Sequence, residues 1–394
     1  MSGAEASAGS DPPGAAVTLY LCIEAAGCPT ICRHCWAQGV GYGAIPAEDI
    51  AWMLDGAHRF CADRGLAFDA YPMHEVVAHP DAAALFGLFN EHSASARDET
   101  MFEPLPTTGV PLAIRDDWRE VLKAAADTGT AHLWLAFHGT GEVHDRQVNR
   151  RGAFAETCLA VQRAHAAGVR VGCNVFLTTA SLPQLDRLAA LRRLPIDAEM
   201  SYETAGFLPT PRSRRNERLR PTLPDLAPVA GRIGELTAPF NRDRWASLED
   251  HTEAAYVRRA MAGDWPAAPG RPGSEIALVC RPSLDVYSGL AGLYRSRHGN
   301  LRADGIDAVL DRAVGHGIRA DDELWFTLDP LPGPAELAAR YGDPSGLGVH
   351  LYPESARYLW LDRAQRASQT AGQVSALTSR FPRRPVAPSG RLGS

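Results

Sequence analysis

The stretch of sequence that decides the fold is VTLYLCIEAAGCPTICRHC, which runs from Val17 to Cys35. Its first part, Val17 to Ile23, is rich in β-branched, aromatic and other apolar residues. Gly27 and Pro29 follow, a pattern typical of a buried strand that ends in a loop. The loop carries three closely spaced cysteines, namely Cys28, Cys32 and Cys35. We therefore expect a metal or redox centre at the end of the first strand.

The three thiols indicate an iron–sulfur cluster. Cysteine thiolates hold such clusters, and three of them leave one iron of a [4Fe–4S] cluster without a protein ligand. Two other interpretations remain open. A structural zinc site would need a fourth ligand, such as His34 or a distant cysteine, and an electron-transfer cluster would need a fourth cysteine. A zinc-stapled binding protein without catalysis is therefore the alternative from another class.

The composition is that of an ordinary globular protein, with 45% hydrophobic and 22% charged residues. No apolar run approaches the length of a membrane span, and the N-terminal residues lack the basic and apolar segments of an export signal. We therefore expect a cytoplasmic protein without a membrane partner. A net charge of −6 argues against a nucleic-acid partner. Eight cysteines in a reducing compartment indicate metal or redox chemistry rather than disulfides.

Strand and helix patterns alternate from residue 17 to about residue 210, which indicates βα units around a parallel sheet. The six strands are expected at Val17–Ile23, at Leu66–Ala70, within Phe102–Asp127, and at Ala131–His138, Val169–Leu177 and Ile196–Tyr202. We predict an α/β fold, a partial (β/α)6 TIM-like barrel with a small C-terminal α/β module.

The domain boundaries follow from composition. Residues 1–16 and 379–394 are dominated by small residues, proline and arginine, and are predicted to be disordered tails. Residues 17–210 are predicted to form the barrel. Residues 211–273 are predicted to be a linker and a helical region, and residues 274–378 the C-terminal module.

With this cysteine spacing and order of elements, the chain resembles the radical S-adenosylmethionine (SAM) superfamily from about Val17 to Tyr202. The resemblance implies that Cys28, Cys32 and Cys35 hold one [4Fe–4S] cluster whose open iron binds SAM. It also implies that an electron, delivered by a donor such as flavodoxin or ferredoxin, cleaves SAM to methionine and a 5′-deoxyadenosyl radical. In such an enzyme the cofactor carries the chemistry, and the protein binds and orients it.

A second motif follows the second strand. In the superfamily a Gly-Gly-Glu-Pro stretch holds the SAM amino group, and here Met73-His74-Glu75-Val76 stands in its place. Glu75 matches the family's glutamate, whereas both glycines and the proline are replaced. The resemblance implies that Met73, His74 and Glu75 bind SAM, together with His34 of the cysteine loop. A helix-capping loop with an incidental glutamate is the alternative.

The fourth and fifth strands carry further candidates. Ala136-Phe137-His138-Gly139 resembles the family's Ser-Leu-Asp-Gly, which implies a cofactor contact at Ala136. His138 ends its strand, where barrel active sites gather, and is a candidate catalytic residue. A hydrogen-bonded core histidine is the alternative. On the fifth strand Asn174 alternates with an apolar face and therefore points inward, where the family places a polar contact to SAM.

Residues 275–313 resemble the SPASM or twitch region of the superfamily, including a Gly299-Asn300 pair before a helix. The cysteines of that region are missing. Ser288 stands where one is expected and none follows Cys280, so we expect no auxiliary cluster. Cys280 is a candidate hydrogen-atom donor to a substrate radical or, alternatively, a buried structural thiol.

These features predict a radical SAM enzyme that abstracts hydrogen from a small polar metabolite in antibiotic or other natural-product biosynthesis. A sugar, aminoglycoside or nucleoside intermediate is the expected substrate. An epimerase, lyase, mutase or sulfur-transfer outcome fits a chain without an auxiliary cluster to accept an electron. The alternative is an enzyme that modifies a ribosomally made peptide and relies on a separate recognition protein.

Overall fold

A computed structural model of the chain describes residues 17–35, 43–73, 75–92, 105–129, 132–205, 215–262, 275–288, 296–315 and 349. The two predicted tails, His74 and most of the last 63 residues of the predicted C-terminal module (316–378) lie outside the described residues. No helix in the described ranges is both long enough and apolar enough to cross a membrane.

The first sheet contains the strand that leads into the cysteine loop. Its five strands are ordered β2-β1-β7-β8-β9. They are β1 (Thr18–Ile23), β2 (Ala67–Pro72), β7 (Glu275–Cys280), β8 (Asp285–Ser288) and β9 (Ser296–Asn300). β1 pairs in parallel with β2 on one side and with β7 on the other, while β8 and β9 continue the sheet antiparallel. β1 therefore lies inside its sheet, with a partner along each edge.

The second sheet is entirely parallel, in the order β3-β4-β5-β6. Its strands are β3 (Leu105–Thr107), β4 (His132–Phe137), β5 (Arg170–Leu177) and β6 (Met200–Thr204). The predicted α/β partial barrel is confirmed, with β7 as a further parallel strand beside β1. β6 begins at Met200, later than expected, and the Asp197 side chain before it accepts from the Val171 N–H at 2.7 Å.

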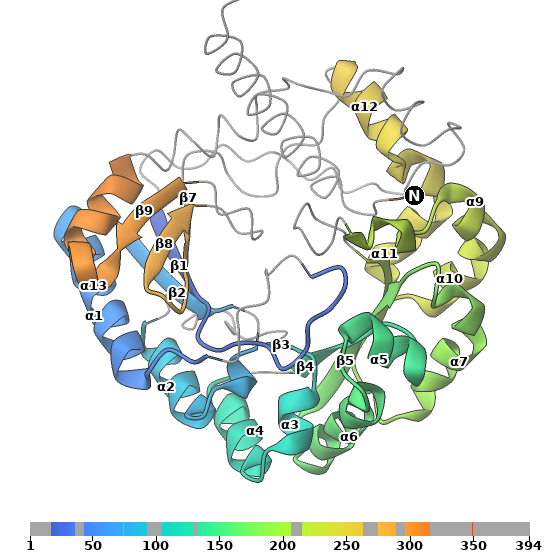
Figure 1. The fold of residues 1–394 in the computed structure, drawn as a ribbon, viewed down its shortest axis with the longest axis horizontal. Coiled ribbons are helices and arrows are strands. Elements are labelled where there is room, and N and C mark those ends of the chain that lie inside the picture. Colours follow the sequence, from blue (N-terminus) through green and yellow to red (C-terminus); the bar gives the residue numbers. More distant parts are fainter. Residues whose placement is uncertain are drawn as a thin grey trace, which may run out of the picture.

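The helices line the outside of the curved wall of strands (Figure 1). Those that alternate with the barrel strands are α1 (Ala47–Arg64), α2 (Ala82–His92), α3 (Val110–Ile114), α4 (Trp118–Asp127), α5 (Glu142–Val148), α6 (Ala153–Ala166) and α7 (Leu185–Ala189). After β6 come α9 (Leu223–Leu226), α10 (Ala230–Leu236), α11 (Pro239–Ala246) and α12 (Glu253–Met261), and α13 (Leu301–Asp304) follows β9.

Alternate residues of β1 face opposite sides of the wall. Leu19, Leu21 and Ile23 are at most 1% exposed and belong to the main core, which the helices cover. Cys22 instead joins a separate small cluster with Met73 and Val279. Because the side chains of a strand alternate between faces, this second cluster marks the concave side, which we call the lumen.

One glycine shapes the lumen. Gly172 on β5 lies opposite Trp134 on β4. A Cβ atom at Gly172 would lie 2.8 Å from the Trp134 ring and 3.0 Å from the Glu199 carbonyl. The indole therefore occupies the space that a side chain would take, on the lumen side of the fourth and fifth strands.

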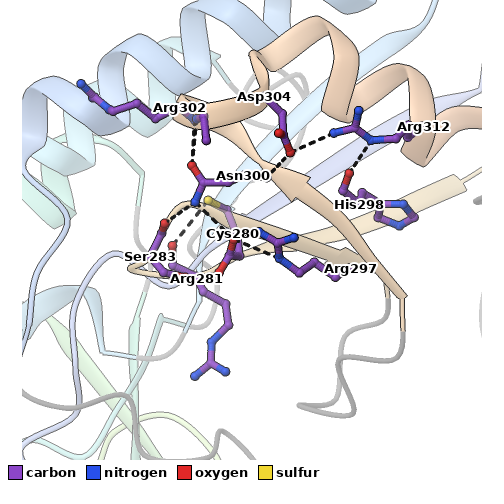
Figure 2. A network of polar contacts seen from close by, with 11 residues as sticks. Cys280, Arg281, Ser283, Arg297, His298, Asn300, Arg302, Asp304 and Arg312 are labelled. Carbon is purple, nitrogen blue, oxygen red and sulfur yellow. Dashed lines mark hydrogen bonds and ion pairs between the residues drawn. The ribbon is translucent and has the colours of Figure 1, made fainter.

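Polar contacts join β8, β9 and α13 in the C-terminal module (Figure 2). The Asn300 side chain caps α13 by accepting from the N–H groups of Arg302 (3.1 Å) and Ala303 (3.0 Å). Arg297 on β9 forms an ion pair of 2.7 Å with Asp285 on β8. Hydrogen bonds and an ion pair thus connect the two strands and the helix in the described part of the module.

The Gly299→Ala variant tests this packing. Gly299 has φ +140°, and an added Cβ would lie 2.4 Å from both Arg312 Nη2 and Asp304 Oδ2. We expect a loss of about 1–3 kcal/mol in the free energy of unfolding, measured by urea denaturation. Gly305→Ala is the matched control, because Gly305 also has a positive φ (+87°) but open space around its Cα. An equal loss in both variants would show that crowding at Gly299 has no effect.

Candidate active site

The cysteine loop lies at the C-terminal end of β1. The Thr30 hydroxyl is 3.1 Å from Cys28 Sγ and 3.6 Å from Cys32 Sγ, so one threonine lies between two of the thiols. The Cys35 N–H donates to the Cys32 carbonyl at 3.1 Å and turns the loop. Burial raises the pKa of Cys28 strongly and that of Cys32 to about 12. Cluster binding, which requires thiolates, would therefore release protons.

The backbone of this loop is held by the last turn of α5. The Ile31 N–H donates to the Val148 carbonyl at 3.0 Å, and the Arg33 N–H donates to the Gln147 carbonyl at 2.9 Å. The last carbonyls of a helix have no helical N–H to bind. The cysteine loop satisfies two of them and is thereby fixed against the segment that follows β4.

Glu75 lies beside the cysteine loop and is only 3% exposed. Its carboxylate accepts hydrogen bonds from the Thr107 hydroxyl and, at 2.9 Å, from the Thr108 N–H. Cys28 Sγ is 3.9 Å from Glu75 Oε2. The structure thus brings the predicted SAM-binding carboxylate next to a predicted cluster ligand.

Side chains hold the loop after β2 in the place of the glycines and proline of the family motif. Arg115 donates to the carbonyls of Val77 (2.6 Å) and His79 (3.3 Å). His79 Nδ1 accepts from the Asp81 N–H at 2.9 Å, so its other nitrogen donates to the Ile45 carbonyl at 2.7 Å. Arg115 thus binds two carbonyls of this loop, and the His79 ring connects the loop to the segment before α1.

Three rings meet at the mouth of the lumen. The centroids of His34 and His138 are 4.6 Å apart, and His138 stacks on Phe176 at 5.1 Å with an interplanar angle of 14°. Burial lowers the pKa of His34 to about 4. Burial, with smaller contributions from His34 and His144, lowers the pKa of His138 well below its usual value. Both imidazoles are therefore neutral at physiological pH.

Two of the buried polar atoms that have no hydrogen-bond partner within the described residues bear on the site. They are Nδ1 of His138 and Oδ1 of Asn174. Asn174 lies opposite Ala136 in the β4–β5 register, two residues before Phe176. Buried polar atoms without a protein partner normally bind a ligand or ordered water. The structure thus gathers the predicted residues His34, Ala136, His138 and Asn174 on one wall.

The opposite wall contains polar residues that the sequence analysis misses. Cys22 on β1 lies opposite Tyr71 on β2, and Tyr71 packs against the cluster that contains Cys22. Glu24 follows β1, is 0% exposed and forms an ion pair of 3.4 Å with Arg281. The signal was available in the alternation of β1, because Cys22 and Glu24 share the face opposite Leu21 and Ile23.

Met73 and Cys280 lie on different sides of the wall. Met73 packs with Cys22 in the lumen. Cys280 is 0% exposed, belongs to the main core and lies with its Sγ 3.5 Å from Met53 Sδ on α1. The thiol therefore faces the helices and not the lumen, a position that favours packing over hydrogen-atom donation. His74 lies outside the described residues.

The donor set fits a [4Fe–4S] cluster with an amino-acid-like ligand. Three thiols share one loop, the Glu75 carboxylate beside them can accept from an ammonium group, and the Asn174 amide oxygen lacks a donor. In the part of the chain that is described, no three His, Cys, Asp or Glu side chains converge as the ligands of a single metal ion would.

The fold is similar to that of several solved structures. Native anSMEcpe with bound AdoMet has a TM-score of 0.50 and 13% identity, over 91% of this chain and 100% of that chain. A second structure of anSMEcpe, with AdoMet and the Cp18Cys peptide, has a TM-score of 0.48 and 13% identity, over 91% of this chain and 99% of that chain. Streptococcus suis SuiB bound to precursor peptide SuiA has a TM-score of 0.46 and 14% identity, over 82% of this chain and 67% of that chain.

At these identities the likeness shows the fold alone. No protein-family model and no curated protein matches the sequence.

The position of Cys280 predicts a purely structural effect of Cys280→Ala. Removing a small buried group should lower the free energy of unfolding by roughly 1 kcal/mol, measured by urea denaturation. In the native protein Cys280 should also resist a thiol-labelling reagent, whereas the half-buried Cys158 should react. Labelling of both thiols at the same rate would contradict the assigned position.

Proposed function

We propose that this protein is a cytoplasmic radical SAM enzyme that binds one [4Fe–4S] cluster and SAM and abstracts hydrogen from a polar substrate. The observation that carries the proposal is the three-thiol loop at the C-terminal end of β1, beside the buried carboxylate of Glu75. Active sites of parallel barrels form at this end of the strands. AdoMet bound to anSMEcpe, which has the same fold, further supports it.

Each residue has a defined part in this proposal. Cys28, Cys32 and Cys35 would hold the cluster, and Glu75 would accept hydrogen bonds from the SAM ammonium group. Further contacts to SAM are assigned to His34, Met73, His74, Ala136 and Asn174. With an electron from a donor such as flavodoxin or ferredoxin, the bound cofactors would supply the radical chemistry that abstracts hydrogen. The protein binds and orients the reactants and excludes water.

The polar side chains of the lumen favour a small polar substrate. Its described wall carries the Glu24–Arg281 ion pair and the phenol of Tyr71, and the carboxylates of Asp69 (6% exposed) and Glu203 (8% exposed). Buried polar groups select ligands with matching hydrogen-bond partners. A sugar, aminoglycoside or nucleoside intermediate of antibiotic biosynthesis is therefore the first candidate. His138 is proposed to contact this substrate or to move a proton.

A ribosomally made peptide is the second candidate substrate. A peptide is bound in a structure of anSMEcpe, and this chain has the anSMEcpe fold. The two candidates are separated by measuring 5′-deoxyadenosine under anaerobic, reducing conditions. Amino sugars and nucleosides are added in one set of assays, and peptides encoded beside the gene in the other. The true substrate class should accelerate cleavage of SAM and become modified.

The cluster itself gives the first test. After anaerobic reconstitution we expect about four irons and four sulfides per chain. The electron paramagnetic resonance signal of the reduced protein should change when SAM is added. Cys32→Ala should abolish this loading, whereas Cys158→Ala should retain it. Stoichiometric zinc without iron uptake would instead support the zinc-stapled binding protein.

Glu75→Gln tests SAM binding separately from cluster binding. The substitution keeps the size of the side chain but removes its charge, so a charge-assisted hydrogen bond to the SAM ammonium group is weakened. We expect a loss of roughly 1.5–3 kcal/mol in SAM binding, measured by equilibrium dialysis, with unchanged iron content. Glu156→Gln is the control, because Glu156 pairs with Arg150. An unchanged SAM affinity in Glu75→Gln would remove this residue from the SAM site.

A further inference from the structure

A surface cavity of about 310 Å³ opens at the N-terminal end of β6. It is lined by the turn that follows α7, by the residues that lead into β6, and by the connection between α10 and α11. None of its lining residues belongs to the candidate active site, which gathers at the C-terminal ends of the strands. The volume is at the lower end of the range for small-molecule sites. The cavity can therefore hold a small metabolite.

The backbone around this cavity is held in place by the edge of β6, the last strand of the described four-stranded sheet. The Tyr202 N–H donates to Thr237 Oγ1 at 2.9 Å, and the Ala238 N–H donates to the Met200 carbonyl at 2.8 Å. The segment between α10 and α11 thus covers the strand edge and satisfies its polar groups. α11 then begins at Pro239, beside the cavity. The wall is therefore formed before any ligand binds.

Three side chains of the wall have hydrogen-bond donors that the described residues do not use. Thr237 is 2% exposed, and its hydroxyl accepts from the Tyr202 N–H but has no acceptor for its own proton among the described residues. Arg192 donates from one guanidinium nitrogen to the Leu236 carbonyl. Arg242 makes no hydrogen bond or ion pair within the described part of the chain. Unused donors around a cavity favour a ligand with several acceptor atoms.

The charges of the wall favour an anion. Arg192 and Arg242 contribute two positive charges, and Glu199 contributes one negative charge. The N-terminal end of α11, which carries a partial positive charge, adds to the positive side. A planar guanidinium binds a carboxylate or a phosphate through paired hydrogen bonds. The wall therefore matches an oxyanion better than a cation.

We propose that this cavity is a binding site for a small metabolite with a carboxylate or phosphate group. Arg192 and Arg242 bind the oxyanion, and the Thr237 hydroxyl donates to it. The ligand connects the turn after α7 with the start of α11, and it stabilises the folded chain by mass action. The site is separate from the proposed radical SAM site, and neither assignment depends on the other.

Isothermal titration calorimetry of the full-length protein as purified tests the proposal. Inorganic phosphate and succinate are the two probes, each titrated at constant ionic strength set with sodium chloride. We expect saturable binding at one site per chain for at least one of them. The anion that binds more tightly shows whether the natural group is a phosphate or a carboxylate. Ethylammonium chloride, a cation of small size, should give no binding. If neither anion binds at millimolar concentrations, or if only the cation binds, the proposal is overturned.

Substitutions in the wall should change the affinity in opposite directions. Arg242→Gln should weaken binding about tenfold, because it removes charge-assisted hydrogen bonds to the ligand but no contact to a described residue. Arg193→Gln is the matched control, because Arg193 is likewise exposed and has no partner among the described residues, yet it does not line the cavity.

Glu199→Gln should strengthen anion binding, because it removes the negative charge of the wall, and a folding defect could not produce this gain. Equal losses in Arg242→Gln and Arg193→Gln would contradict the assignment. Weaker anion binding in Glu199→Gln would also overturn it.

Discussion

The arrangement of the site depends on the pairing of β1 with a parallel strand along each edge. Parallel neighbours place their C-terminal ends at one edge of a sheet. The β1–β2 pairing therefore brings the cysteine loop next to the loop of Glu75, and the β1–β7 pairing brings Glu24 next to Arg281. Each of these neighbours comes from a distant part of the sequence. Without these two strand pairings, the cysteine thiols, the Glu75 carboxylate and the Glu24–Arg281 ion pair would not be held close together.

Hydrogen bonds from other elements hold the loops at this edge of the sheet. Glycines let a backbone approach a ligand closely, but they also cost conformational entropy on folding. Here the loop after β2 has no glycines between Met73 and His79. Arg115 donates to the loop carbonyls of Val77 and His79, and the His79 ring donates to the Ile45 carbonyl before α1. The cysteine loop is fixed in a similar way by the carbonyl end of α5. Hydrogen bonds from other elements thus replace local backbone freedom.

The sequence predicts the strands, the three thiols and those lumen residues that lie on strands where buried and lumen-facing positions alternate clearly. On β5, Asn174 lies between Cys173 and Val175, which are both 0% exposed, so its face could be predicted. The side of Cys280 could not be predicted, because β7 is apolar on both faces and only its pairing with β1 decides which face meets α1. The contacts of Gln147 and His79 were also out of reach. They depend on where α5 and the loop after β2 lie in space. The local sequence does not indicate these positions.

The charges of the lumen restrict which ligands can enter it. His34 and His138 are neutral because burial lowers the pKa of both, so neither contributes a positive charge at physiological pH. Among the described residues, the lumen carries the carboxylates of Glu24, Asp69 and Glu203, with that of Glu75 beside the cysteine loop, and the guanidinium of Arg281, which is paired with Glu24. An anionic ligand would meet these carboxylates or compete with Glu24 for Arg281, and leaving a buried charge unpaired is costly. A neutral or cationic ligand with several hydrogen-bonding groups meets no such penalty, which is the electrostatic reason for placing amino sugars ahead of acidic metabolites.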